Sequence, residues 1–93
     1  MAGNRTRFNR MERLVKGFSN HRRVEILYLL DKKPELSVFD VAWELDVDFR
    51  TISEHIRRMA VAGLVIKRFE GKNVRHKLTE RGKVILTFLR TLE

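Results

Sequence analysis

The sequence predicts a mainly α-helical fold with one small β-hairpin, of the α+β class. Apolar residues recur every three or four positions along most of the chain, and they alternate at every second position only after Gly63. Only five Gly and one Pro occur among 93 residues, of which 43% are hydrophobic, and this is typical of a folded, helix-rich protein. The short chain contains no repeat or linker, so we expect one domain over residues 1–93.

Three helices are predicted outside the central part of the chain. The first spans about residues 7–18, where apolar residues recur at helical spacing. The second begins after Asn20, a good N-cap, and ends before Pro34, because proline lacks a backbone donor and disfavours helix at the preceding residue. The last spans about residues 80–92 and begins after Thr79.

A helix-turn-helix is predicted at about residues 37–62. Ser37 and Asp40 have the spacing of a capping box at the start of its first helix. Asp48 is a suitable N-cap for the second helix, which begins near Phe49.

The second helix of this unit has one apolar side and one polar side. Ile52, Ile56 and Met59 share a stripe that is expected to face the core. Polar residues at the first turns of such a helix are placed to contact base edges in the major groove. The candidates for base recognition are Arg50, Thr51, Ser53, Glu54 and Arg57. Glu54 either accepts a hydrogen bond from cytosine or pairs with a neighbouring arginine, and both alternatives stay open.

A β-hairpin is predicted at about residues 64–78, where two alternating segments flank the turn-like sequence EGKN. Val74, His76 and Leu78 are expected on one face, and Arg75 and Lys77 on the other. Long cations beside a hairpin tip suit contacts with phosphates or the minor groove. The candidates for phosphate contact are Arg58, Lys67, Arg68, Lys72, Arg75 and Lys77. Two helices followed by a basic hairpin describe a winged helix-turn-helix.

The charges are segregated along the chain. The formal net charge is +8, from 20 Lys and Arg against 12 Asp and Glu. Residues 31–48 are mainly acidic, whereas residues 1–23 and 49–83 are mainly basic. This segregation favours a face that binds a polyanion, with a contribution from the N-terminus, and we expect double-stranded DNA as the partner.

Several classes of protein are disfavoured. No apolar run is long enough to span a membrane and no apolar segment of a secretory signal follows the basic N-terminus, so we expect a cytoplasmic protein without a membrane partner. There is no nucleophile–base arrangement and no phosphate-binding glycine loop, so we expect neither an enzyme nor a cofactor. The chain has no cysteine, and His21, His55 and His76 are far apart, so these histidines are expected to be structural and no metal is expected.

Three aromatic residues near the helix-turn-helix are expected to pack inward. Phe39 and Trp43 are four positions apart and share a helix face, which favours a role in the core or between helices over a ligand pocket. Phe49 is expected to tuck inward rather than to contact a thymine methyl group.

The chain resembles the ArsR/SmtB family of prokaryotic winged-helix transcriptional regulators. The resemblance lies in SNHRRVEILYLL, in ELSVFDVAWELDVDFRTISEHIRRMAVAGLV and in EGKNVRHKLTERG, and so covers about residues 19–82. It implies a homodimer on a pseudo-palindromic operator, usually as a repressor, with an interface built from the first and last helices. The candidate interface residues are Phe8, Met11, Val15, Phe18, Ile85, Phe88, Leu89 and Leu92.

The metal sites of that family are not matched. Ser37 and Phe39 stand where ELCVC-like sequences have cysteines, and the last helix contains no histidine. The resemblance therefore implies a regulator without the usual metal switch.

Two other functions stay open from the sequence. Winged helices also mediate protein contacts, with Phe39 and Trp43 as a possible exposed anchor, and in that case Arg50 and Arg57 would be dispensable. A non-specific architectural DNA-binding protein would bind shuffled duplexes as well as any selected one.

Overall fold

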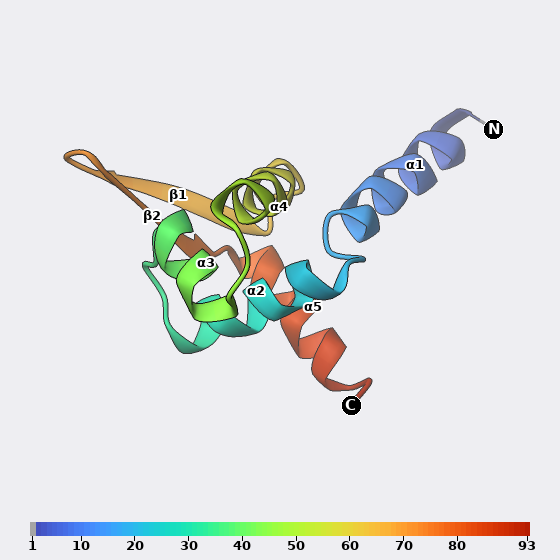
Figure 1. Ribbon diagram of the computed structural model, residues 1–93. Helices are drawn as coiled ribbons and strands as arrows, with labels where there is room; N and C mark the ends of the chain where they lie inside the picture. The colour runs from blue at the N-terminus through green and yellow to red at the C-terminus, as the bar shows by residue number, and fades with distance from the viewer. Residues whose placement is uncertain (1) are drawn as a thin grey trace.

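The computed structural model describes residues 2–93 of the chain, and the side chains from Asn4 onward. Within this range it contains five helices and one antiparallel hairpin (Figure 1). Their order is α1 (Ala2–Lys16), α2 (His21–Lys32), α3 (Val38–Leu45), α4 (Phe49–Val61), β1 (Val65–Glu70), β2 (Asn73–Leu78) and α5 (Glu80–Arg90). The predicted α+β class with a two-stranded wing is therefore confirmed. No helix in the described range is both long and apolar enough to cross a membrane.

The helices begin where side-chain caps satisfy their first backbone amides. Asn20 accepts hydrogen bonds from two amides of α2, and Thr79 accepts one from the first turn of α5. Ser37 and Asp40 form the reciprocal capping box of α3, and Asp48 accepts from the Thr51 amide at 2.9 Å. These predicted caps are confirmed, because each depends only on residues within one helical turn.

The core lies between α2, α4, α5 and the base of the hairpin. The predicted stripe of α4 is confirmed, since Ile52, Ile56 and Met59 are all buried. They pack in one cluster with Ile26 and Leu27 of α2, among others. Full burial of such a side chain contributes about 1.5–3 kcal/mol, so this cluster fixes the orientation of α4.

The hairpin has a regular register from Val65 opposite Leu78 to Glu70 opposite Asn73. Gly71, with φ +60°, begins the two-residue turn at its tip, where glycine accommodates the positive φ. The segment before α3 adds an isolated antiparallel bridge, in which Leu36 pairs with His76. This bridge was not predicted, because it joins two segments that are far apart in the sequence.

His76 lies at the centre of this bridge and is only 1% exposed. Its amide donates to the Leu36 carbonyl at 2.9 Å, and its ring Nδ1 lies 2.9 Å from the same oxygen. Burial lowers the pKa of His76 below its ordinary value of 6.5, and the charge of Lys67 acts in the same direction. The ring is therefore held neutral inside the fold.

We expect the protein to lose stability as the pH falls below the ordinary histidine pKa. The unfolded chain then binds a proton at His76 that the folded chain does not bind, so the free energy of unfolding decreases by at most about 1.4 kcal/mol per pH unit for this group. Urea unfolding at about pH 7.5 and about pH 5.5 measures this loss in the free energy of unfolding. His55 also contributes to the loss, because its pKa is lowered as well. The His76→Gln variant should lose less. An equal loss in the variant would mean that His76 is not responsible.

Helix α1 projects from the rest of the molecule (Figure 1). From Asn4 to Lys16 every side chain except that of Leu14 is exposed. The helix begins earlier than the predicted start near residue 7, and it ends before Phe18. Phe18 is turned into the core, where it is 8% exposed, so its expected role in a dimer interface is corrected.

The prediction for the three aromatic residues was wrong. Phe39, Trp43 and Phe49 are 66%, 79% and 55% exposed, and all three line a shallow pocket at the turn between α3 and α4. Helix α3 has only eight residues, and its Val41 and Ala42 already occupy the side that faces the core. The neighbouring side, which carries Phe39 and Trp43, is therefore left to solvent.

Candidate nucleic-acid interface

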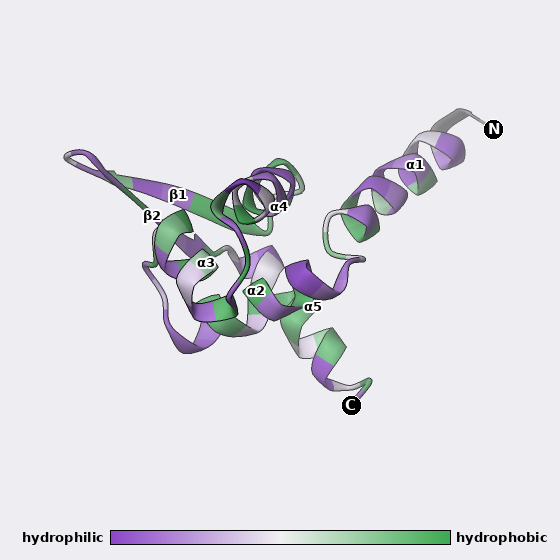
Figure 2. Ribbon diagram, viewed as in Figure 1, coloured by the Kyte–Doolittle hydropathy of each residue, from purple (hydrophilic) through white to green (hydrophobic). Residues whose placement is uncertain are grey.

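The outer side of α4 presents the polar residues that the sequence singled out. Figure 2 shows both hydrophobic and hydrophilic residues along α4. The hydrophobic Ile52, Ile56 and Met59 are the buried ones. Arg50 lies in the first turn and is exposed. The Arg50 side chain makes no hydrogen bond or ion pair with any residue that the structure describes. It can therefore reach a base without first breaking a contact.

Two other candidates in the first turns of α4 are less available. The Thr51 hydroxyl donates to Asp48 Oδ2 at 2.6 Å, and this bond lowers the pKa of the Asp48 carboxyl. Ser53 is half-buried. Thr51 therefore helps to hold the start of the helix, and Arg50 is the freest candidate for base contact.

Glu54 forms a cluster with two arginines. Its Oε1 lies 2.6 Å from Arg57 Nη2 and 2.9 Å from Arg58 Nε. The two guanidinium groups lower the pKa of Glu54 to about 2, chiefly through these hydrogen bonds with Arg57 and Arg58. Glu54 is therefore ionised and bridges the arginines in the free protein. All three side chains are exposed, so phosphates could replace the carboxylate at little cost.

The cations of the wing fall into two groups. Arg68 Nε donates to Glu35 at 3.1 Å and its Nη1 to Glu70 at 3.0 Å, and Arg75 donates to the Glu35 carbonyl at 3.3 Å. These arginines tie the wing to the segment before α3. The second group consists of exposed lysines that have no such bonds among the described side chains, namely Lys67, Lys72 and Lys77.

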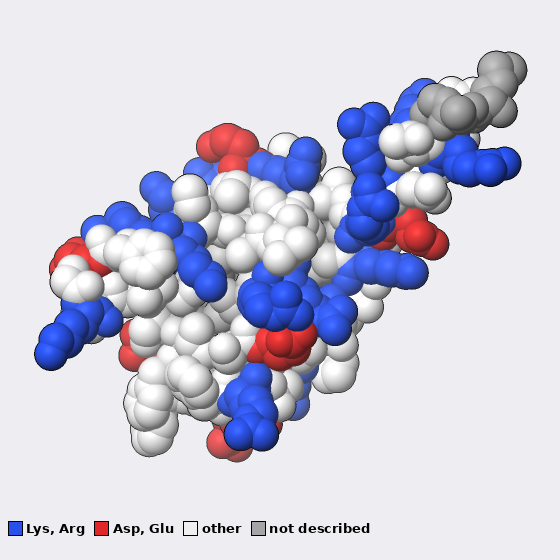
Figure 3. All heavy atoms as spheres, turned by 90° about the horizontal axis from the view of Figure 1, so that it is seen from above, with Lys and Arg blue, Asp and Glu red and all other residues white. Residues whose placement is uncertain are grey.

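Many cations lie on the face of the molecule that bears the wing and α1 (Figure 3). Figure 3 shows this face from above, where Lys and Arg extend from the wing across the body to α1 and predominate over Asp and Glu. A duplex laid along this face would meet positive charge at the wing, on the body and at α1 (Figure 3), and such charge attracts phosphates.

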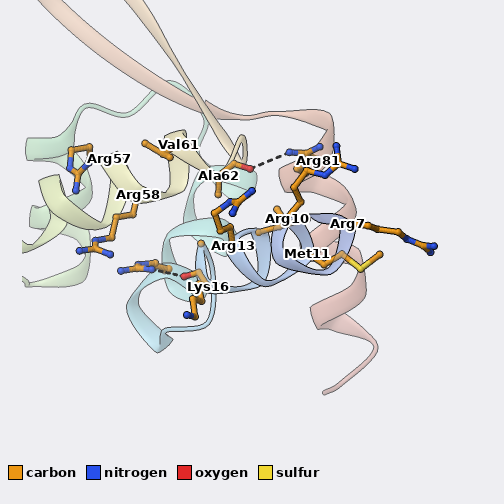
Figure 4. Close-up of a pocket in the computed structure, with 13 residues that line it drawn as sticks. Arg7, Arg10, Met11, Arg13, Lys16, Arg57, Arg58, Val61, Ala62 and Arg81 are labelled. Atoms are coloured by element: carbon orange, nitrogen blue, oxygen red, sulfur yellow. Dashed lines mark hydrogen bonds between the residues drawn. The ribbon is translucent and has the colours of Figure 1, made fainter. Parts of the chain in front are cut away.

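A groove with many basic residues lies between α1 and the end of α4, beside the start of α5 (Figure 4). We call it the basic groove, and its volume is about 710 Å³. The cations that line it are Arg7, Arg10, Arg13, Lys16, Arg23, Arg57, Arg58 and Arg81. The sequence showed that the N-terminus is basic, but not that this segment faces Arg81 and α4, because no local pattern carries that information.

The remaining interface candidates lie on α1 and α5, at the side of the molecule away from the wing tip (Figure 1). Most of them are exposed, namely Phe8, Met11, Val15, Phe88 and Leu92. Ile85 and Leu89 are half-buried against the core. Val84 is also exposed, at 65%, and the sequence prediction had omitted it.

The described residues contain no group of three His, Cys, Asp or Glu side chains placed to hold a metal ion. His55 accepts a hydrogen bond from Arg23 Nε at 3.1 Å, and His76 lies in the core, so both contact neighbouring elements of the fold.

Several solved structures are similar to this chain over most of its length, among them the following two. The first is the homodimeric winged helix-turn-helix DNA-binding domain of a possible ArsR-family transcriptional regulator from Mycobacterium bovis, with a TM-score of 0.85, 23% identity and coverage of 96% of this chain and 82% of that one. The second is the transcriptional regulator HlyU from Vibrio vulnificus, with a TM-score of 0.73, 29% identity and coverage of 99% and 98%. Because the Mycobacterium bovis domain is only 23% identical to this chain, its similarity supports the fold alone.

The sequence comparisons agree with this likeness. The chain is 35% identical over 68 residues to the cadmium resistance transcriptional regulatory protein CadC homolog of Staphylococcus aureus, which covers 73% of this chain. It spans only 56% of the length of that relative. Residues 20–67, from the N-cap of α2 into β1, match the family "Bacterial regulatory protein, arsR family". This is a family of regulators and not of enzymes, and the chain belongs to it.

Proposed function

We propose that this protein is a sequence-specific regulator of transcription that binds double-stranded DNA as a homodimer and acts as a repressor. The observation that carries the proposal is the outer side of α4, which the buried stripe holds in place and which presents Arg50 free of any ion pair among the described side chains. A guanidinium group at this position suits bidentate contact with guanine. A repressor would act by occupying the operator.

The two parts of the basic face have different roles in this proposal. The residues of α4 contact base edges in the major groove, with Arg50 as the main one. The exposed lysines of the wing contact phosphates, which adds affinity for any sequence and makes binding depend on salt. Arg68 and Arg75 hold the wing in place through Glu35, and they contact DNA only where they can release these bonds.

Self-association is supported by the apolar residues left uncovered on α1 and α5. Helix α1 has 15 residues, and an isolated helix of about this length is marginal in water. Helix α1 needs a partner surface to bury Phe8 and Val15. In a second copy of the chain, the surface around the exposed Phe88 of α5 provides such a partner. The residues of the proposed interface are Phe8, Met11, Val15, Ile85, Phe88, Leu89 and Leu92, with Val84 added.

We also propose that this regulator lacks the thiolate metal switch of some relatives. Ser37 caps α3 through its hydroxyl, and Phe39 is an exposed hydrocarbon ring. Neither side chain is a ligand for a soft metal ion, and the 93 residues contain no cysteine.

Selection of bound duplexes from a random pool at about 150 mM salt tests the proposal. We expect an inverted repeat with half-sites about one helical turn apart, since two copies related by a two-fold axis bind two equivalent sites. Recovery of no motif would overturn sequence-specific binding and leave duplex affinity as a general effect of charge.

Substitution of Lys72 by alanine is expected to weaken binding to all duplexes alike. Lys72 lies at the exposed wing tip, beside Gly71, and is proposed to contact a phosphate. The slope of log affinity against log salt should fall by about one, because one fewer counterion is released. Fluorescence anisotropy at several salt concentrations measures this slope, with Lys32→Ala, in the acidic segment, as the control. A change in sequence preference would show that the wing reads bases.

A second candidate function is a protein-interaction module, and the exposure of Phe39, Trp43 and Phe49 is the observation that favours it. Acidic residues surround this aromatic cluster, since Asp46 and Asp48 line the same pocket. Under this alternative the selection would recover no motif, and substitution of Trp43, but not of Arg50, would abolish binding to the partner.

A further inference from the structure

The basic groove brings cations from several helices to one place. Its cations come from four helices, since Arg13 is in α1, Arg23 in α2, Arg58 in α4 and Arg81 in α5. Figure 4 shows Arg10 and Arg13 extending from α1 toward Ala62 and Arg81, whereas Arg7 points away. The fold thus brings together cations that are far apart in the sequence.

These cations have few anionic partners. Among the described residues no carboxylate lines the groove. From outside it, Glu54 pairs with Arg57 and Arg58, and Glu12 lies 3.8 Å from Lys16. The side chains of Arg10 and Arg13 have no hydrogen bond or ion pair with any described residue. Burial lowers the pKa of Arg23, and the charge of Arg58 acts in the same direction, whereas the charge of Glu54 opposes it. An anion in the groove would relieve this repulsion.

The groove also has apolar walls. Leu14 of α1 lies half-buried on one side, and Val61 and Ala62 lie at the end of α4 on the other. Val61 is 79% exposed, although it is a β-branched hydrocarbon on a helix that presents mostly polar groups to solvent. A phosphodiester backbone has no apolar group to pack against these residues. A ligand with an apolar body would cover them and gain the free energy of burying apolar surface. The volume of about 710 Å³ lies within the range of small-molecule sites.

We propose that the basic groove binds a small amphipathic anion, with a phosphate or carboxylate group held by Arg10, Arg13 and Arg81 and an apolar body against Leu14 and Val61. Such a ligand also reaches Arg57 and Arg58, which are candidates for contact with DNA. Occupancy of the groove therefore weakens binding to DNA. This regulatory consequence rests on the proposed function, but the binding site itself does not.

Titration of the isotopically labelled full chain, followed by NMR in the absence of DNA, tests the site. The probes are phenyl phosphate, inorganic phosphate, which has the charge alone, and benzyl alcohol, which has the apolar ring alone. We expect phenyl phosphate to bind most tightly and to shift the amide signals of Leu14, Val61 and Ala62. Equal affinities for phenyl phosphate and inorganic phosphate would overturn the proposal.

Variants show where the probe binds. The double substitution Arg10→Gln and Arg13→Gln removes two exposed cations of α1 and should weaken phenyl phosphate binding about tenfold, as expected for loss of charge-assisted hydrogen bonds. Lys32→Gln removes an exposed cation outside the groove and should change the affinity little. Because the double variant removes two charges and Lys32→Gln only one, a logarithmic loss of affinity in Lys32→Gln at least half as large as in the double variant would show that the probe follows net charge and not the groove.

A second arm measures binding to the selected duplex with and without phenyl phosphate. We expect the probe to raise the Kd for DNA in the unmodified protein and to do so less in the double variant. If the double variant lost affinity for the duplex but not for phenyl phosphate, the groove would hold the DNA backbone, and the proposal would be wrong. If no duplex were selected, the titration without DNA would still decide the site.

Discussion

Replacing Arg50 by alanine is expected to cost about 1–3 kcal/mol of binding to the selected duplex and to relax its preference at one base pair. Arg50 lies exposed in the first turn of α4, the part of a reading helix that contacts base edges. Its planar guanidinium can donate two parallel hydrogen bonds to guanine O6 and N7, and no other base offers this pair of acceptors. Binding to the selected duplex and to single-base variants of it measures the effect.

Arg50→Lys is the matched variant for this prediction. Lysine keeps the charge of Arg50 but presents a single point of contact, so the salt dependence of binding should stay unchanged while the base preference is lost. If Arg50→Ala instead weakened all duplexes equally and lowered the salt slope, Arg50 would contact a phosphate, and the main base contact would have to come from Arg57 or another residue of α4.

Replacing Gly82 by alanine is expected to destabilise the protein by about 3 kcal/mol, although alanine is the better helix former. Gly82 lies in the first turn of α5, where an added Cβ would stand 2.2 Å from the carbonyl oxygen of Leu64. That oxygen cannot easily retreat, because it accepts a hydrogen bond from the Thr79 amide at 3.0 Å. The clash with fixed backbone therefore outweighs the gain of about 1 kcal/mol in helix propensity.

Gly71→Ala is the control for Gly82→Ala. Gly71 has φ +60° but no atom within 4 Å of an added Cβ, so its substitution carries only the cost of a left-handed conformation, about 1–2 kcal/mol. Urea unfolding of both variants gives the comparison. If Gly82→Ala were the more stable of the two, the contact between α5 and Leu64 would be able to relax, and helix propensity would decide the outcome.

Much of the secondary structure could be predicted because it depends on neighbours in the sequence. Asn20, Ser37 and Asp48 cap helices by contacts within one turn, and Pro34 follows the end of α2. The stripe of Ile52, Ile56 and Met59 also follows from local spacing, and burial confirmed it. Arg50 could be named as a base-contact candidate for the same reason, since its place in the first turn of α4 follows from the cap.

The predictions of which apolar residues are buried failed where several residues or helices could have packed against the same part of the core. Phe39 and Trp43 share a helix face and are apolar, as expected, but Val41 and Ala42 occupy the inner side of the short α3. Phe18 has the spacing of the exposed stripe of α1, yet the chain leaves the helix at Gly17 and turns Phe18 into the core. Apolar character alone does not say which of several candidate residues is buried.

The sequence by itself determined the order of helices and hairpin, their caps, the apolar stripe of α4 and the segregation of charge. Each of these is encoded within a few residues, by periodicity, a cap or a run of like charges. Only the tertiary structure decided that Leu36 pairs with His76, that Glu35 holds Arg68 and Arg75, and that Arg13 and Arg81 line one groove. The physical reason is that these contacts join distant segments, which come together only when the shared core fixes the elements in space.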